Sequence, residues 1–305
     1  SAMPRVPSIA VVGSGSWAER HMATIVAEEG MTFAGIVSQS LSEEPRTLLA
    51  DVGSPKVWPN LDALLESGVE LDGVALVVEP ARIADLSYQC IDAGLPVLAE
   101  KPLSFSSREA NSIRQRAVSR NCPFFVNLIH LYSAGYGELS RRIDEIGPLE
   151  HIESIGGNDG PFRRYMSGMW DYGPHDLSMV LDIVGEAPES IEAMRLNGDG
   201  VVHTIRVEMS FGSGISAKLT FGNLMTVKQR RFRCVGSGGT LELDDHPTPK
   251  LLKNNTGIAI EGIRPLASVY RAFVRSFDTK KDPANSLELA CRVNAILERV
   301  ARDLN

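Results

Sequence analysis

Short apolar runs alternate with helix-like spacing over the first 127 residues of the chain. Runs rich in Val, Ile and Ala are typical of strands buried on both faces, and apolar positions three and four residues apart are typical of helices. We predict strands at Ser8–Val12, Thr32–Val37, Lys56–Trp58, Asp72–Val78, Pro96–Ala99 and Pro123–Asn127. We predict helices at Trp17–Glu29, Ser42–Asp51, Leu61–Ser67, Arg82–Ala93 and Ser107–Asn121. This alternation predicts an α/β domain with a doubly wound parallel sheet over residues 1–125.

The second part of the chain has the two-residue alternation of half-buried strands. Apolar side chains occupy every second position from His203 to Phe211, and again from Ile215 to Phe221 after a Gly-Ser-Gly turn. Another short strand is expected at Thr240–Leu243. Strands joined by tight glycine turns indicate a large open, mainly antiparallel sheet. We expect a second domain over residues 126–305, closed by helices at Leu266–Phe277 and Ser286–Leu304, with the free sheet face pairing copies into a homodimer or homotetramer.

The first predicted strand runs into a glycine turn, Gly13-Ser14-Gly15-Ser16-Trp17-Ala18. In such a turn the first glycine permits a tight bend and the second lets the backbone approach a pyrophosphate, while the helix N-terminus favours the phosphate charge. The turn therefore predicts a dinucleotide site. We expect the dinucleotide to be bound by these residues and by others that follow predicted strands: Gly13, Gly15, Ser16, Trp17, Ser38, Glu79, Pro80, Glu100 and Lys101.

The end of the second predicted strand bears on the choice between NAD and NADP. An acidic residue there would hold the ribose 2′-hydroxyl of NAD, and the chain has Val37-Ser38-Gln39-Ser40 instead. Small hydroxyl residues admit a 2′-phosphate, with Arg46 as a candidate counter-charge. We therefore favour NADP, although loosely held NAD would leave the same pattern.

Three further segments carry candidate catalytic chemistry, and we expect them to meet between the two domains. Lys101 follows the fifth strand, at the edge where open α/β sheets bind ligands. Asp171 and His175 lie four residues apart, so they share a face if the helix around them begins early; Gly173-Pro174 favours a later start. His130 and Arg163 are candidates for binding substrate hydroxyls or a carboxylate, and ordinary surface polarity would explain them as well.

These residue types suit the removal of a hydride from a carbinol carbon. The hydroxyl proton must leave as well, and a histidine that titrates near neutral pH can accept it. A lysine ammonium stabilises the developing alkoxide, and an aspartate orients the histidine or the substrate. The nicotinamide supplies the hydride chemistry.

Composition and charge narrow the class of partner. The net charge of −7 and the pI of about 5.5 argue against a nucleic-acid partner, which needs a basic face. The run Lys228-Gln229-Arg230-Arg231-Phe232-Arg233 is either the solvated face of a strand or a docking site for an anionic substrate or acidic subunit.

Four scattered cysteines lack metal-ligand spacing, so we expect no metal. Neither a transmembrane-length run nor a signal peptide is apparent, and we expect a cytoplasmic protein without membrane contact.

The motifs resemble those of the Gfo/Idh/MocA family, named after glucose–fructose oxidoreductase, inositol dehydrogenase and a rhizopine catabolism protein. Val11-Val12-Gly13-Ser14-Gly15 is similar to the family's opening, Glu100-Lys101-Pro102 resembles its Glu-Lys-Pro strand, and Asp171 to His175 resembles its Asp-x-x-x-His motif. The resemblance implies a Rossmann domain followed by an α/β domain with an open sheet. It also implies NAD(P)-dependent oxidation of a sugar, inositol or sugar nucleotide, with Lys101, Asp171 and His175 as the catalytic residues.

Several positions depart from the family pattern. Glu79-Pro80-Ala81 stands where members often carry Thr-Pro-Asn, His130 stands where an arginine is common, and Ser178 stands where many have an aspartate. Two other readings stay open: a non-catalytic dinucleotide-binding sensor of the same fold, and a glycosidase that oxidises its substrate transiently.

Overall fold

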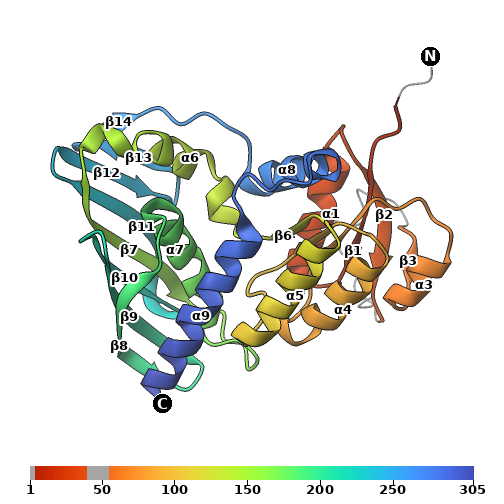
Figure 1. Cartoon of the computed structure of the whole chain (residues 1–305), viewed down its shortest axis with the longest axis horizontal. Coiled ribbons are helices and arrows are strands. Elements are labelled where there is room, and N and C mark those ends of the chain that lie inside the picture. The colour runs from red at the N-terminus through yellow and green to blue at the C-terminus, as the bar shows by residue number, and fades with distance from the viewer. Residues whose placement is uncertain (1–3, 40–54) are drawn as a thin grey trace. The chain divides into compact units, whose positions relative to one another are not determined.

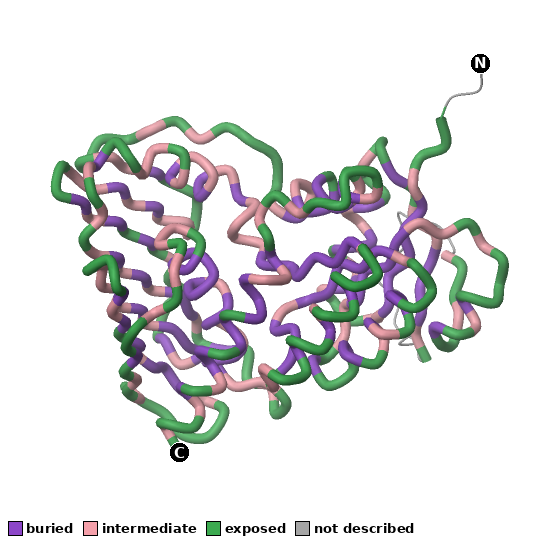
Figure 2. The backbone as a smooth tube through the Cα atoms, in the orientation of Figure 1, coloured by how far each residue is buried: buried purple, intermediate pink, exposed green. Residues whose placement is uncertain are grey.

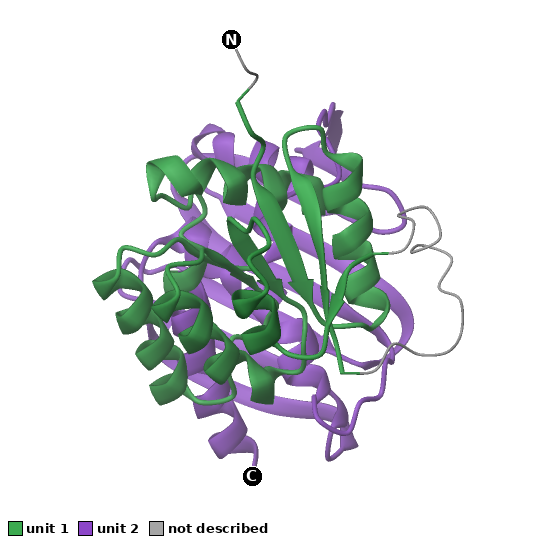
Figure 3. Ribbon diagram, turned by 90° about the vertical axis from the view of Figure 1, so that its right-hand side faces the viewer, with its two compact units in different colours: residues 1–127, 266–288 green, residues 128–265, 289–305 purple. Residues whose placement is uncertain are grey.

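A computed structural model describes residues 4–39 and 55–305, which form two compact units (Figure 3). Unit 1 comprises residues 1–127 and 266–288, and unit 2 comprises residues 128–265 and 289–305. The predicted helix over 42–51, Ser40 and Arg46 lie outside the described residues.

Unit 1 is built on a six-stranded sheet with the strand order β3-β2-β1-β4-β5-β6. All neighbouring strands pair in parallel. The strands are β1 (Ser8–Val12), β2 (Thr32–Val37), β3 (Val57–Trp58), β4 (Gly73–Leu76), β5 (Val97–Ala99) and β6 (Phe124–Val126). Every residue of β1, β4, β5 and β6 is buried, which explains why these strands read as continuous apolar runs. The prediction of a doubly wound parallel sheet is confirmed.

Helices cover this sheet (Figure 1). They are α1 (Ser16–Ala27), α3 (Leu61–Glu66), α4 (Pro80–Asp92), α5 (Ser107–Ser119) and α8 (Pro265–Thr279). The sequence assigned residues 266–277 to the second domain, whereas the structure groups residues 266–288 with unit 1. The reason is aromatic packing: Phe273 of α8 meets Phe125 of β6 edge to face at 5.5 Å, and a Cβ on Gly73 would lie 2.8 Å from the ring of Phe277.

Unit 2 is built on an eight-stranded sheet with the order β14-β13-β12-β11-β7-β10-β9-β8. The strands are β7 (Leu149–Asp159), β8 (Pro188–Asp199), β9 (Val202–Phe211), β10 (Ser216–Gly222), β11 (Leu224–Gly236), β12 (Gly239–Asp244), β13 (Lys250–Lys253) and β14 (Thr256–Ile258). Neighbours pair antiparallel except β7 and β10, which pair in parallel. The expected large, mainly antiparallel sheet is confirmed.

One face of this sheet carries a long helix. The helical elements of unit 2 are η1 (Ile129–Tyr132), α6 (Ala134–Arg141), η2 (Ile143–Ile146), α7 (Gly168–Val184) and most of α9 (Ser286–Leu304). A Cβ on Gly173 of α7 would lie 2.8 Å from Phe221 of β10 and 3.1 Å from Leu297 of α9. Helix α7 is therefore packed closely between the sheet and α9, and most of its residues are buried (Figure 2).

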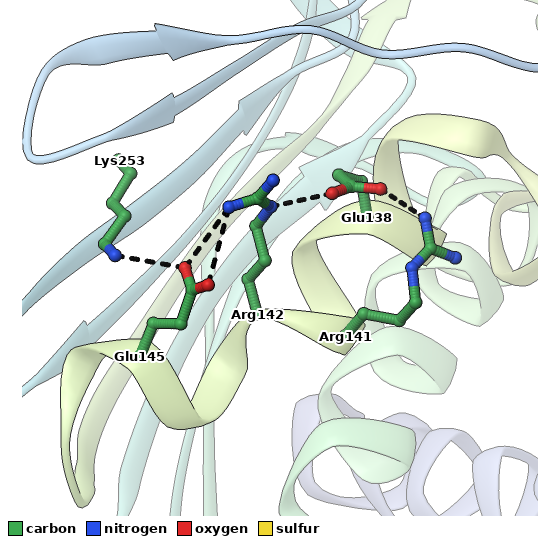
Figure 4. A network of polar contacts seen from close by, with 5 residues as sticks. All are labelled: Glu138, Arg141, Arg142, Glu145 and Lys253. Atoms are coloured by element: carbon green, nitrogen blue, oxygen red, sulfur yellow. Dashed lines mark hydrogen bonds and ion pairs between the residues drawn. The ribbon is translucent and has the colours of Figure 1, made fainter.

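An exposed ion-pair network joins α6, η2 and β13 (Figure 4). Glu138 pairs with Arg141 and Arg142, and Glu145 pairs with Arg142 and with Lys253 at 3.0 Å. Hydrogen bonds from these cations lower the pKa of both glutamates. Exposed pairs of this kind contribute little to stability.

The basic run lies on β11, with Lys228, Arg231 and Arg233 exposed and Arg230 turned inward, its side chain 11% exposed. Met194 on β8 and Val227 on β11 are exposed apolar side chains, at 58% and 61%. Pairing of copies through this sheet stays a prediction. Within the described ranges no helix is long and apolar enough to cross a membrane.

Candidate active site

The glycine turn after β1 has the shape that a dinucleotide requires. Gly13 has φ +133°, and a Cβ there would lie 2.2 Å from the carbonyl oxygen of Val77, so only glycine fits. Gly15 caps α1, where no described side chain accepts a hydrogen bond, and a Cβ on it would meet no described atom within 4 Å. The open space beside Gly15 and the amide groups at the start of α1 fit a pyrophosphate.

Alanine at these two glycines separates folding from binding. We expect Gly13→Ala to lower the melting temperature strongly, because its Cβ collides with backbone and its φ is strained. We expect Gly15→Ala to melt as the wild type does but to bind NADPH more weakly, because the methyl group occupies the approach of the phosphate. Thermal melts and fluorescence titration measure the two effects, and equal behaviour of the two variants would contradict this reading of the turn.

Other predicted cofactor residues follow strands at the same carboxyl edge of the unit 1 sheet. Ser38 comes directly after β2, and its backbone N–H donates to the carbonyl of Trp58 at 3.0 Å. Glu79 is exposed and caps α4, and Pro80 is the first residue of that helix. These positions agree with the strand ends expected from the sequence, and their contacts with a dinucleotide stay predictions.

Lys101 is half-buried and lies two residues past β5. In the sheet order, β4 alone separates β5 from β1, so Lys101 lies two strand spacings, about 10 Å, along the edge from the glycine turn. The structure thus places an ammonium beside the phosphate turn on one edge of one sheet.

Glu100, predicted to bind the cofactor, is engaged inside unit 1. Its Oε1 accepts hydrogen bonds from Trp17 Nε1 at 2.6 Å, His21 Nε2 at 2.8 Å and Asn127 Nδ2 at 2.7 Å. Burial favours a higher pKa for the Glu100 carboxyl, but the hydrogen bonds and charge of His21, with those from Asn127 and Trp17, outweigh it and lower the pKa. The carboxylate therefore ties the first turn of α1 to the end of β5, and so fixes the backbone that carries Lys101.

This network extends to α8. His21 is fully buried, and its Nδ1 lies 2.7 Å from the hydroxyl of Tyr270. Sequence reasoning missed His21 and Tyr270, which are 249 residues apart. The available signal was the four-residue spacing of Trp17 and His21, which places both on one face of α1.

Asp171 and His175 lie on one face of α7 in unit 2, because the helix begins at Gly168, before both residues. Ser167 caps it by accepting a hydrogen bond from the N–H of Trp170 at 3.4 Å. The Gly-Pro pair that favoured a later start lies inside the helix. The cap and the close packing of Gly173 outweigh the hydrogen bond that Pro174 cannot make.

Arg163, predicted as a substrate contact, pairs with Asp171, with Nη1 3.1 Å from Oδ2. The Asp171 side chain is 15% exposed and that of Arg163 is 41% exposed. Tyr172 donates to the carbonyl of Gly160 at 2.6 Å, which holds the loop that carries Arg163 against α7. Arg163 therefore compensates the charge of Asp171 in this structure.

His130 lies on η1, with its ring edge-to-face against His175 at 4.4 Å between centroids. Behind them, Asp176 is 1% exposed; its Oδ1 accepts from the hydroxyl of Ser154 and lies 3.9 Å from Arg230 Nη1. Burial raises the pKa of Asp176, although Arg230 and Ser154 act in the opposite direction. The sequence left the basic run open as a solvated strand face or a docking site; within it, Arg230 is turned inward and pairs with Asp176.

The start of α7 is anchored by His203 of β9. The Met169 N–H donates to His203 Nε2 at 3.0 Å, so Nε2 carries no proton, and Nδ1 lies 2.8 Å from the carbonyl of Gly200. Burial lowers the pKa of His203, and the charge of Arg195 lowers it further. The hydrogen bond to the Gly200 carbonyl acts in the opposite direction but does not outweigh them. The neutral imidazole is therefore part of the helix anchor.

We expect His203 to make stability depend on pH. Its pKa is lower in the folded than in the unfolded chain, so the unfolded chain binds more protons, and stability falls as pH drops below about 6.5, the unfolded value. Thermal melts across this range measure the effect. We expect His203→Gln to lose less stability than the wild type as the pH falls, and His151→Asn to lose as much as the wild type. An unchanged pH dependence of stability in His203→Gln would contradict the role of His203.

Comparison with known proteins adds to this geometry. Residues 8–128 match the model of an oxidoreductase family with an NAD-binding Rossmann fold, and residues 140–242 match the GFO/IDH/MocA C-terminal domain. The chain belongs to the Gfo/Idh/MocA family. Its resemblance to that family is thereby confirmed, and the protein is an NAD(P)-dependent oxidoreductase.

Individual relatives of this Gfo/Idh/MocA protein are distant. It is 26% identical over 264 residues to a dTDP-3,4-didehydro-2,6-dideoxy-alpha-D-glucose 3-reductase of Streptomyces violaceoruber, covering 80% of this chain and 75% of the relative. It is 24% identical over 193 residues to inositol 2-dehydrogenase 2 of Mycolicibacterium vanbaalenii, covering 61% and 56%. The fold matches that of a UDP-N-acetylglucosamine 3-dehydrogenase of Acidithiobacillus ferrooxidans, with TM-score 0.84, 19% identity and 97% coverage of both chains.

Proposed function

We propose that the protein transfers a hydride between NADP and a secondary hydroxyl of a sugar, inositol or sugar nucleotide. The observation that carries this proposal is the position of Lys101, two strand spacings from a glycine turn that fits a pyrophosphate. The 3-reductase and inositol dehydrogenase relatives support the substrate class, because both act on ring carbons that bear oxygen.

The proposed roles follow from charge and position. The glycine turn and Ser38 would hold the dinucleotide, whose nicotinamide would supply the acceptor for the carbinol hydrogen and its electron pair. His175 accepts the proton of the hydroxyl group, and Lys101 stabilises the developing negative charge on oxygen. Asp171, which shares the helix face of His175, orients His175 or the substrate, with Arg163 balancing its charge at 3.1 Å.

Deuterium transfer tests this function directly. NADPH deuterated at the transferred hydrogen is incubated with the protein and a 3-keto sugar nucleotide or an inosose, and the product is analysed by mass spectrometry. The proposal expects deuterium on the reduced ring carbon. Glycosidic cleavage without net deuterium transfer would contradict it and favour the transient-oxidation alternative.

The preference for NADP rests on the side chain after β2. Ser38 is half-buried there and brings no negative charge to a ribose 2′-phosphate. We expect Ser38→Asp to weaken NADPH binding about tenfold or more by charge repulsion, a change of about 1.4 kcal/mol, and to leave NADH affinity equal or higher. Fluorescence titration with both cofactors measures this, with Ser38→Ala as the uncharged control. Tighter NADH than NADPH in the wild type would overturn the preference.

A further inference from the structure

His130 and His175 form a pair of imidazoles inside unit 2. They come from η1 and α7, and their rings meet edge to face with planes at 86° and centroids 4.4 Å apart. At this separation two positive rings repel each other in a partly buried setting. The pair therefore takes up a second proton with much more difficulty than a first.

A carboxylate stands beside one ring of the pair. Asp245 Oδ2 lies 3.7 Å from His130 Nδ1, and the two side chains are 18% and 19% exposed. Asp245 directly follows β12, and its backbone N–H donates to the carbonyl of Arg230 at 2.8 Å, which holds the backbone that carries this carboxylate. An opposite charge this close favours the protonated form of His130.

The other charged groups around the pair are themselves paired. From α7 and β11, Asp176 and Arg230 lie 3.9 Å apart. Arg231 of β11 pairs with Glu242 at 3.5 Å and is 51% exposed. Asp171, on the same helix as His175, pairs with Arg163. A small cavity in unit 2 is lined by His130, by the carboxylates Asp176 and Asp245, and by other described residues. Because Asp176 is paired with Arg230, Asp245 is the lining carboxylate placed to decide which ring holds the proton.

We propose that His130, held by Asp245, is a positioning residue that fixes the ring of His175 and keeps it in the neutral, proton-accepting form. This inference rests on the proposed function, in which His175 takes the hydroxyl proton. It differs from the sequence-based expectation that His130 binds substrate. A substrate contact changes KM, whereas a charged neighbour of the base changes the pH at which the base works.

Two variants separate packing from charge. His130→Phe keeps an aromatic ring against His175 and removes the charge, and Asp245→Asn keeps the shape of the carboxylate and removes its charge. The readout is the titration of the ring C–H resonances of His130 and His175 by NMR, with the full chain and no added ligand. The chain has 6 histidines, so the signals can be assigned by substitution.

In the wild type His130 should titrate at higher pH than His175. We expect His130→Phe to raise the midpoint of His175 by about one pH unit, and Asp245→Asn to lower that of His130 by about the same amount. Unchanged midpoints in both variants would overturn the inference. Because these titrations need neither substrate nor cofactor, they are read independently of the proposed function.

Kinetics then connect the pair to the reaction. The acid limb of the kcat profile should move up by about one pH unit in His130→Phe, with little change in KM at high pH. A raised KM with an unmoved acid limb would mark His130 as a substrate contact and overturn the positioning role. If the wild type transfers no deuterium, the proposed function fails whatever the titrations show.

Discussion

Replacing Lys101 with alanine should lower kcat about 10²–10³-fold, the usual cost of removing one group that stabilises an oxyanion. Lys101 lies two residues past β5 on the sheet edge that carries the glycine turn, where we propose that its charge stabilises the substrate oxygen. NADPH should still bind, because the turn after β1 and the start of α1 are unaltered. Steady-state rates and fluorescence titration of the same preparation measure both quantities.

Lys218→Ala is the matched control for this experiment. Lys218 lies on β10 in unit 2, with its Nζ 4.0 Å from Oε1 of Glu153, and it has no proposed role in the reaction. The kcat of Lys218→Ala should equal that of the wild type. Loss of NADPH binding in Lys101→Ala, in proportion to the loss of rate, would show that the lysine holds the cofactor and does not serve the chemical step.

Replacing His175 with alanine should lower kcat about 10²–10⁴-fold, the range for loss of a positioned general base. The acid limb of the pH profile should disappear with the imidazole, and added free imidazole should restore part of the rate. The measurement is kcat against pH, with His151→Ala as the control, since His151 contacts Ser216 on β10. A variant that keeps the acid limb would assign the base to another residue.

Most elements of unit 1 could be predicted from the sequence because each is marked by a short stretch of contiguous residues. Its strands are short apolar runs, and β1, β3, β4 and β5 are each followed by a helix. The glycine turn and the Glu-Lys-Pro strand end lie where that pattern puts them. Lys101, Gly13 and Gly15 were found this way. The exception is α8, which joins the sheet of unit 1 from the far end of the sequence through Tyr270 and Phe273.

The second unit was harder because its contacts are distant in sequence. The parallel pairing of β7 with β10 is made by no glycine turn, so strand alternation did not reveal it. The sequence left the start of α7 open, because Gly173-Pro174 is typical of a helix entry, whereas the helix is capped by Ser167. The ring beside His175 comes from η1, and the carboxylate beside that ring comes from the residue after β12; nothing in the sequence spacing marks Asp245.

The proposed hydride transfer can be measured as turnover with a panel of alcohols. The protein is mixed with NADP⁺ or NAD⁺ and with nucleotide sugars, aldoses or inositols, and the absorbance of reduced nicotinamide is followed beside Lys101→Ala and His175→Ala. We expect stoichiometric reduction of the nicotinamide with at least one of these substrates, and little or no reduction in either variant. Reduction at an equal rate in both variants, or hydrolysis of a substrate without reduction, would contradict it.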